Sequence, residues 1–275
     1  MRWLGSQGGG VDQEKRLILR FLEQSEWDDA LTGKLPHFDG FHWQPGYCAR
    51  ADADRLTAAG KLGWRYLNVL QAPCPEWAGG DPILDRMAAL IPTLPSTFPW
   101  FPCTGGIRRP VYDWRAPAQA AIQELVTMMA RERMPFFLDQ FWPHPRPWMC
   151  AEGNFDSYDP GTWVHWTRKL NRFAQLVRQR PRLGSTVVNG DFLGPKPVML
   201  EHPEWWGRFE AAVEVWHEHP LNVLAPDAGV PWAMQALLDL HIRYPEKWIA
   251  LKGAPAAVVA GYRALAWERS YEVWQ

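Results

Sequence analysis

Two acidic residues follow short apolar runs, and carboxylates in such positions can do chemistry. Asp139 comes after "PFFL" and Glu201 after "PVML". An acid in an apolar run costs free energy unless it is paired, so it is rarely present for packing alone. Two carboxyl groups suit hydrolysis of a glycosidic bond, because one attacks or stabilises the cationic transition state while the other protonates the leaving oxygen. Such acids can also cap a helix or hold a loop, so the elements around them matter.

The elements that would position these acids are short apolar runs bounded by turn residues, a pattern that is typical of strands. These runs cover residues 37–43, 65–71, 96–102, 135–141, 185–191, 197–201, 221–227 and 247–252. Stretches with apolar residues at helical spacing separate most of them. The helical stretches cover residues 49–63, 81–92, 116–133, 162–180, 203–219, 231–244 and 254–274, and one over residues 12–24 leads the chain.

Strands that alternate with helices indicate a parallel sheet with crossover connections. Eight strand–helix units favour closure into a barrel over an open sheet, and the length of 275 residues fits one barrel. The sequence therefore predicts an α/β fold, a (β/α)8 TIM barrel that forms a single domain over residues 1–275. Residues 1–36 are predicted to be an N-terminal extension that holds the leading helix.

Polar residues at the ends of the predicted strands form the candidate site, because barrel enzymes carry their chemistry on the loops at the C-terminal face. These residues are His42, Gln44, Gln71, Asp139, Asn189, Asp191, Glu201 and Asp227. Tryptophan is also unusually frequent, with 18 residues. Its flat apolar face suits stacking on a sugar ring, although a single tryptophan is more often part of the core. The excess favours a carbohydrate ligand.

Charge and hydropathy disfavour other partners. The net charge is −1, so nucleic acid is not an expected partner, and the arginine-rich stretches 108–110 and 178–182 are interpreted as solvated surface. No run of 18 apolar residues occurs, so membrane insertion is not expected. The N-terminal residues lack the apolar core of a signal peptide, and the sequence does not indicate a compartment.

Two segments resemble a known family. "VYDWRAPAQAAIQELVTMMARERMPFFLDQFW" and "RKLNRFAQLVRQRPRLGSTVVNGDFLGPKPVMLEHPEWW" are similar to the middle of glycoside-hydrolase-like TIM barrels related to the polygalactosaminidase group. The resemblance covers roughly residues 95–230. It rests on a strand that ends in Leu-Asp, a strand that ends in Asn-Gly and a short segment that ends in Glu. The family's Asp-Gly before the first of these strands is absent here, which leaves the substrate class open.

The resemblance implies that Asp139 is the nucleophile and Glu201 the acid/base, with Glu152, Glu204, Asp191 and Asp227 as alternatives. Residues near these acids are predicted to contact the sugar. They are His42, Trp142, His144, Trp148, Asn189, Asp191, His202, Trp205, Trp206 and Asp227. No cofactor or metal is predicted, because His144 and His202 lack a convincing third ligand.

The four cysteines, Cys48, Cys74, Cys103 and Cys150, have no zinc-ribbon spacing. Each follows one of the first four predicted strands, so neighbours such as Cys48 and Cys74 could pair. Free buried thiols are the favoured interpretation.

Two alternatives to a glycosidase remain open. One is a TIM barrel without catalytic activity that serves as a glycan-binding or structural component, for instance of a virion or a cell-envelope assembly. The other is a barrel isomerase or aldolase, which would need a lysine at a strand end. Lys252 is the candidate for that role.

Overall fold

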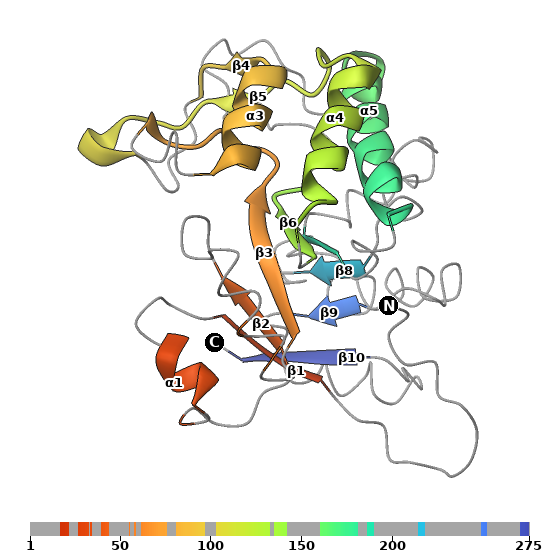
Figure 1. Ribbon diagram of the computed structural model, residues 1–275. Coiled ribbons are helices and arrows are strands. Elements are labelled where there is room, and N and C mark those ends of the chain that lie inside the picture. Colours follow the sequence, from red (N-terminus) through yellow and green to blue (C-terminus); the bar gives the residue numbers. More distant parts are fainter. Residues whose placement is uncertain are drawn as a thin grey trace, which may run out of the picture.

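The computed structural model (Figure 1) describes residues 17–21, 27–32, 34, 40–43, 55, 58, 62–75, 81–96, 103–132, 135–141, 160–180, 186–189, 214–217, 249–251 and 270–274. Eight strands form one closed barrel in which every neighbouring pair is parallel. They are β1 (Leu17–Phe21), β2 (Gly40–Trp43), β3 (Leu62–Asn68), β6 (Phe136–Asp139), β7 (Val187–Asn189), β8 (Glu214–His217), β9 (Ile249–Leu251) and β10 (Ser270–Trp274). Each barrel strand pairs with the next one along the chain, and β10 pairs with β1.

Five barrel strands lie where the sequence predicts strands, namely β2, β3, β6, β7 and β9. Three further strands are predicted over residues 96–102, 197–201 and 221–227, whereas the described strands pair β3 with β6, β7 with β8, and β8 with β9. Apart from Ser96, those three runs lie outside the described residues.

Three barrel strands, β1, β8 and β10, lie within segments predicted to be helices, and for these strand residues the predictions are wrong. The β1 segment "LILRF" is a continuous apolar run, which is typical of strands buried on both faces of a parallel sheet. Over so few residues, apolar spacing does not separate a helix from a strand. The segments "EVWH" of β8 and "SYEVW" of β10 carry valine and aromatic residues, which favour strands. Residues 17–21 therefore belong to the barrel and not to an N-terminal extension.

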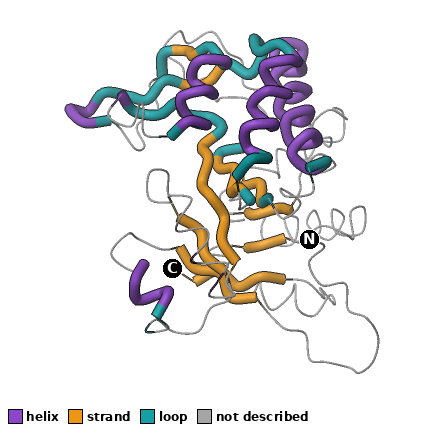
Figure 2. The backbone as a smooth tube through the Cα atoms, in the orientation of Figure 1, coloured by secondary structure: helices purple, strands orange, loops and turns teal. Residues whose placement is uncertain are grey.

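Three predicted helices are confirmed as α3 (Pro82–Leu90), α4 (Gln119–Met129) and α5 (Pro160–Arg178). They pack side by side, α4 between α3 and α5, on one side of the strands (Figure 2). Leu67, Leu138 and Val188, on neighbouring strands, are almost completely buried. A short helix, α1 (Trp27–Leu31), lies between β1 and β2. The other predicted helices stay predictions where their connections lie outside the described residues. None of the described helices is long and apolar enough to span a membrane.

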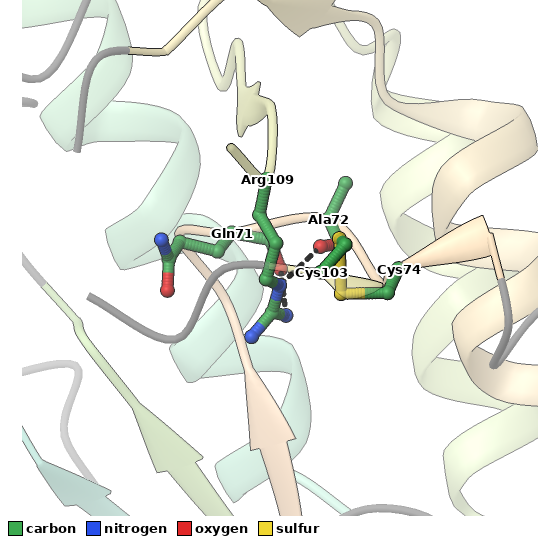
Figure 3. The surroundings of a disulfide bond; sticks show 5 residues. All are labelled: Gln71, Ala72, Cys74, Cys103 and Arg109. Atoms are coloured by element: carbon green, nitrogen blue, oxygen red, sulfur yellow. Dashed lines mark hydrogen bonds between the residues drawn. A yellow bond between two sulfur atoms is a disulfide. The ribbon is translucent and has the colours of Figure 1, made fainter. Parts of the chain in front are cut away.

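The connection from β3 to β6 holds more than a crossover helix. Besides α3 and α4 it contains an antiparallel pair, β4 (Thr93–Leu94) and β5 (Val111–Tyr112), and the 3-10 helix η3 (Thr104–Gly106). Cys74 and Cys103 form a disulfide with their Cα atoms 5.3 Å apart, which ties this insertion to the segment after β3 (Figure 3). The expectation of free thiols is wrong for these two cysteines, whereas Cys48 and Cys150 lie outside the described residues.

Arg109 also holds the insertion against the segment that follows β3. Its Nε donates to the Ala72 carbonyl at 2.7 Å and its second terminal nitrogen donates to the Gln71 carbonyl at 3.0 Å (Figure 3). The side chain is buried, so the interpretation of residues 108–110 as solvated surface holds for exposed Arg108 and is wrong for Arg109.

Candidate active site

The candidate site begins with the pairing of β3 and β6, which places Asn68 opposite Asp139 and Tyr66 opposite Phe137. Successive residues of a strand point to opposite faces of the sheet. Arg65 forms ion pairs with Asp81, which caps α3, and with Glu132, so it points outward to the helices. Tyr66 and Asn68 therefore lie on the same face of β3, toward the barrel interior.

Asp139 lies on the same interior face at the C-terminal end of β6. The hydroxyl of Tyr66 donates a hydrogen bond of 2.6 Å to Asp139 Oδ2. The amide nitrogen of Asn68 donates to the same hydroxyl oxygen at 3.2 Å. The acid, the phenol and the amide therefore form a chain of hydrogen bonds across two barrel strands.

The backbone around this chain is tightly held. Asn68 Oδ1 accepts hydrogen bonds from the backbone N–H groups of Leu70 and Gln71 at 2.9 and 2.8 Å, which fixes the turn after β3. The N–H of Val69 donates to the Asp139 carbonyl at 3.0 Å. The indole N–H of Trp114, from the insertion, donates to the Val69 carbonyl at 2.6 Å. These bonds set the position of Asp139 relative to Tyr66.

The electrostatics of the site follow from burial. Burial raises the pKa of Tyr66 well above its usual value, and the charge of Asp139 and its hydrogen bond to the phenol raise that pKa further. Tyr66 therefore stays a neutral hydrogen-bond donor across the physiological range. Burial lowers the pKa of Arg109, an effect that the nearby Tyr66, Tyr112 and Asp139 oppose. Arg109 thus places a buried positive group within electrostatic reach of Asp139.

Gln140, the residue after Asp139, has an unusual backbone. Its φ of 54° lies in the left-handed region, which residues other than glycine rarely adopt. Its side chain is buried, and its Oε1 has no hydrogen-bond partner in the described part of the chain. Strained backbone and unsatisfied buried polar atoms both concentrate at functional sites. This supports a functional role for the end of β6.

Of the other predicted site residues, the structure describes the backbone of Asn189 and His42. Asn189 is the last residue of β7, and because Leu138 pairs with Val188, Asn189 follows on the strand next to Asp139. His42 lies in β2 and pairs with Trp64 of β3. The side chains of Asn189 and His42 are outside the described part. The same holds for all of Gln44, Trp142, His144, Trp148, Glu152, Asp191, Glu201, His202, Glu204, Trp205, Trp206 and Asp227.

The prediction that Glu201 ends the sixth barrel strand falls on residues that the structure does not describe. The strand that follows β7 around the barrel is β8, which ends at His217. Glu201 lies outside the described residues, so its role stays a prediction. Gln71 does not end β3; it forms an isolated bridge with Val111 of β5 and is buried.

Sequence reasoning missed Tyr66, Asn68 and Arg109. The first two alternate with apolar residues in "RYLNVLQ", and that spacing puts them on one face of a strand. The signal for a polar face was therefore present. Nothing local in the sequence indicates that Tyr66 meets Asp139, because the two are 73 residues apart.

No protein-family model and no curated protein matches the sequence. Among solved structures, the glycoside hydrolase domain of PelA from Pseudomonas aeruginosa is similar, with 17% identity, 94% of each chain covered and a TM-score of 0.52. Ega3 of Aspergillus fumigatus in complex with galactosamine is 8% identical over 98% of this chain and 94% of the other, with a TM-score of 0.46. The α-galactosidase AgaA from Geobacillus stearothermophilus is 10% identical over 95% of this chain and 39% of the other, with a TM-score of 0.49. The likeness to the PelA domain shows that the chain has a glycoside-hydrolase-like fold.

Proposed function

We propose that the protein is a glycoside hydrolase that cleaves a polysaccharide with two carboxyl groups, of which Asp139 is one. The observation that carries the proposal is the position of Asp139, at the C-terminal end of a strand in a closed parallel barrel and hydrogen-bonded to Tyr66. Chemistry in parallel α/β barrels takes place at that end of the strands. The likeness to the PelA glycoside hydrolase domain supports the fold on which this reasoning depends.

In the proposed reaction Asp139 is the nucleophile. A carboxylate oxygen bonds to the anomeric carbon while the bond from that carbon to the glycosidic oxygen breaks. Glu201 gives its proton to the departing oxygen, and water then hydrolyses the glycosyl ester with Glu201 as the base. A separation of roughly 5–5.5 Å between the two carboxyl groups would fit this retaining course, and roughly 6.5–9.5 Å would fit inversion. Tyr66 remains protonated and takes no proton from either acid.

The remaining parts of the site complete the proposal. The domain is a single (β/α)8 barrel. The aromatic residues that follow the acids stack on sugar rings, and polar residues at strand ends bind hydroxyl groups. These contacts are assigned to His42, Trp142, Trp148, Asn189, Asp191, His202, Trp205 and Asp227. No metal or cofactor takes part.

The experiment that tests this proposal is a hydrolysis screen. Wild-type protein is incubated with soluble polysaccharides of neutral, acidic and amino sugars, and released reducing ends are measured. D139N, prepared identically, serves as the blank that reveals contaminating hydrolases. We expect wild type to release reducing ends from at least one polymer and D139N to release none above background. Binding of a polymer by wild type without any release would contradict the proposal and support the inactive, glycan-binding alternative.

A further inference from the structure

We propose that Tyr66 is the positioning residue for Asp139, and that Asn68 orients the phenol so that its single hydroxyl hydrogen is committed to the carboxylate. This inference rests on the proposed function, because it assigns Tyr66 the task of keeping that carboxylate ionised and in place during hydrolysis. The acid and the phenol lie on adjacent strands, in a region where β3 and β6 pair in register.

The geometry fixes the direction of the hydrogen bond. A tyrosine hydroxyl has one hydrogen to donate and lone pairs to accept. Asn68 donates its amide N–H to the hydroxyl oxygen at 3.2 Å, and the hydroxyl donates to Asp139 Oδ2 at 2.6 Å. Asn68 is itself held in place, because its Oδ1 accepts from the N–H groups of Leu70 and Gln71. The amide therefore presents its nitrogen, and not its oxygen, to the phenol.

The ring of Tyr66 has little room to turn away. It stacks on Phe137, the residue opposite it in the pairing, with ring centroids 6.3 Å apart and an angle of 15° between the planes. Asn68, on the same face of β3, is almost fully buried. A partly buried, stacked phenol loses little conformational freedom when it binds the carboxylate, so the contact is preorganised before any sugar enters.

A hydrogen bond to the ionised form of an acid favours that form. Bonds to charged groups at about 2.5–2.7 Å are stronger than those between neutral groups. Burial keeps the phenol protonated, since it raises the pKa of Tyr66 far above neutrality, and the donor persists over the whole range in which Asp139 titrates. Tyr66 thus lowers the pKa of Asp139 relative to the same carboxyl without the phenol.

Within the described part of the chain, Arg109, from the segment before β5, interacts electrostatically with both Asp139 and Tyr66. It also favours the ionised acid, but its N–H groups bind backbone carbonyls of Gln71 and Ala72. The other neighbour of β6 is β7, whose residues Val187, Val188 and Asn189 do not ionise. Removing the Tyr66 hydroxyl therefore leaves the charge of Arg109 in place, which isolates the contribution of the phenol.

The test is a titration of Asp139 that needs no substrate. Protein labelled with 13C at the aspartate carboxyl carbon is titrated by NMR, and the Asp139 signal is identified by its absence from D139N. In Y66F the midpoint is expected to rise by about one to two pH units, as loss of a hydrogen bond to a charged group implies. Where a cleaved polysaccharide is known, the acidic limb of kcat/KM should move to higher pH by the same amount.

Two further variants make the result interpretable. Y112F removes a second buried tyrosine hydroxyl, one that has no hydrogen-bond partner among the described residues, and should leave the Asp139 midpoint unchanged. N68S stays uncharged and keeps a side-chain oxygen that can accept from the N–H groups of Leu70 and Gln71, but it takes away the amide donor. Its Asp139 midpoint should rise as in Y66F, which keeps the inference testable if Y66F does not fold.

An Asp139 midpoint in folded Y66F within about 0.3 pH units of wild type would overturn the assignment of Tyr66, as would an equal rise in Y112F. If Y66F does not fold, an unchanged midpoint in N68S would do the same. None of these results depends on hydrolysis. The proposed function itself would be contradicted by a different result, namely a D139N variant that cleaves every polymer as fast as wild type.

Discussion

The disulfide between Cys74 and Cys103 should stabilise the barrel measurably. It joins the segment after β3 to the insertion that carries Arg109 and Trp114, both of which bond to the backbone next to the candidate site. Reduction removes the covalent link and leaves every other atom in place. Reduced wild type is therefore a cleaner comparison than a cysteine variant, which would also lose buried packing.

The magnitude follows from the length of the closed loop. The two cysteines are 29 residues apart in sequence. The chain-entropy treatment gives a loss of conformational entropy in the unfolded chain that corresponds to about 3.6 kcal/mol at 25 °C for a loop of this length. With a urea m-value of about 3 kcal/mol per molar, reduction should lower the denaturation midpoint by about 1.2 M.

The assay combines peptide mapping with urea denaturation. Trypsin cleaves after Arg65, Arg86 and Arg108, so the disulfide should link the peptides 66–86 and 87–108 in a non-reduced digest. Circular dichroism then gives the urea midpoint of oxidised and reduced wild type. The C74A/C103A variant is the control, because adding reductant to it should not change its midpoint.

Two results would refute this reasoning. One is a non-reduced digest in which Cys74 or Cys103 is linked to Cys48 or Cys150, or in which both are free thiols. The other is a linked digest together with equal urea midpoints for oxidised and reduced protein, which would mean that the closed loop does not restrict the unfolded chain.

Two further predictions concern stability. Asp81 caps α3 by accepting from the N–H groups of Ile83 and Leu84, and it also pairs with Arg65. D81A should therefore lower the free energy of unfolding by about 2 kcal/mol, whereas D81N keeps the cap and should lose less. Equal urea midpoints for the two variants would contradict the capping argument. Burial is the main reason why the pKa values of Tyr66 and Tyr112 are raised in the folded protein. Their contribution to stability is therefore complete below a pH of about 10. Above that pH the free energy of unfolding should decline by about 1.4 kcal/mol per pH unit for each tyrosine. Urea midpoints between pH 9 and 11, roughly, check this, and an equally steep decline in the Y66F/Y112F double variant would count against it.

The sequence alone predicts those helices and strands that have a clear local pattern of apolar residues. The helices α3, α4 and α5 have long amphipathic stretches, and strands such as β6 have apolar runs bounded by turn residues. The segments of β1 and β10 are predicted to be helices because a short apolar segment beside charged residues fits the residue spacing of a helix as well as that of a strand. What makes them strands is their pairing with each other and with β2 and β9, which no local pattern contains.

The same limit applies to the candidate site. Asp139 could be predicted because an acid directly after "PFFL" is conspicuous by itself. Tyr66 and Asn68 belong to the site only through the pairing of β3 with β6, across an insertion that contains α3, β4, β5 and α4. Arg109 was assigned to the surface because its charge suggested solvent, and the backbone carbonyls that bind it lie 37 and 38 residues away.

The central claim, that Asp139 is the carboxylate that acts on the sugar, is tested most directly by kcat/KM of D139N on the first polysaccharide that wild type cleaves. D113N is the matched control, since Asp113 is a partly buried carboxylate that pairs with Arg115 in the insertion. We predict that D139N loses between about 10²- and 10⁴-fold in kcat/KM, while D113N stays within about threefold of wild type. A D139N variant that is folded and as active as D113N would contradict the claim.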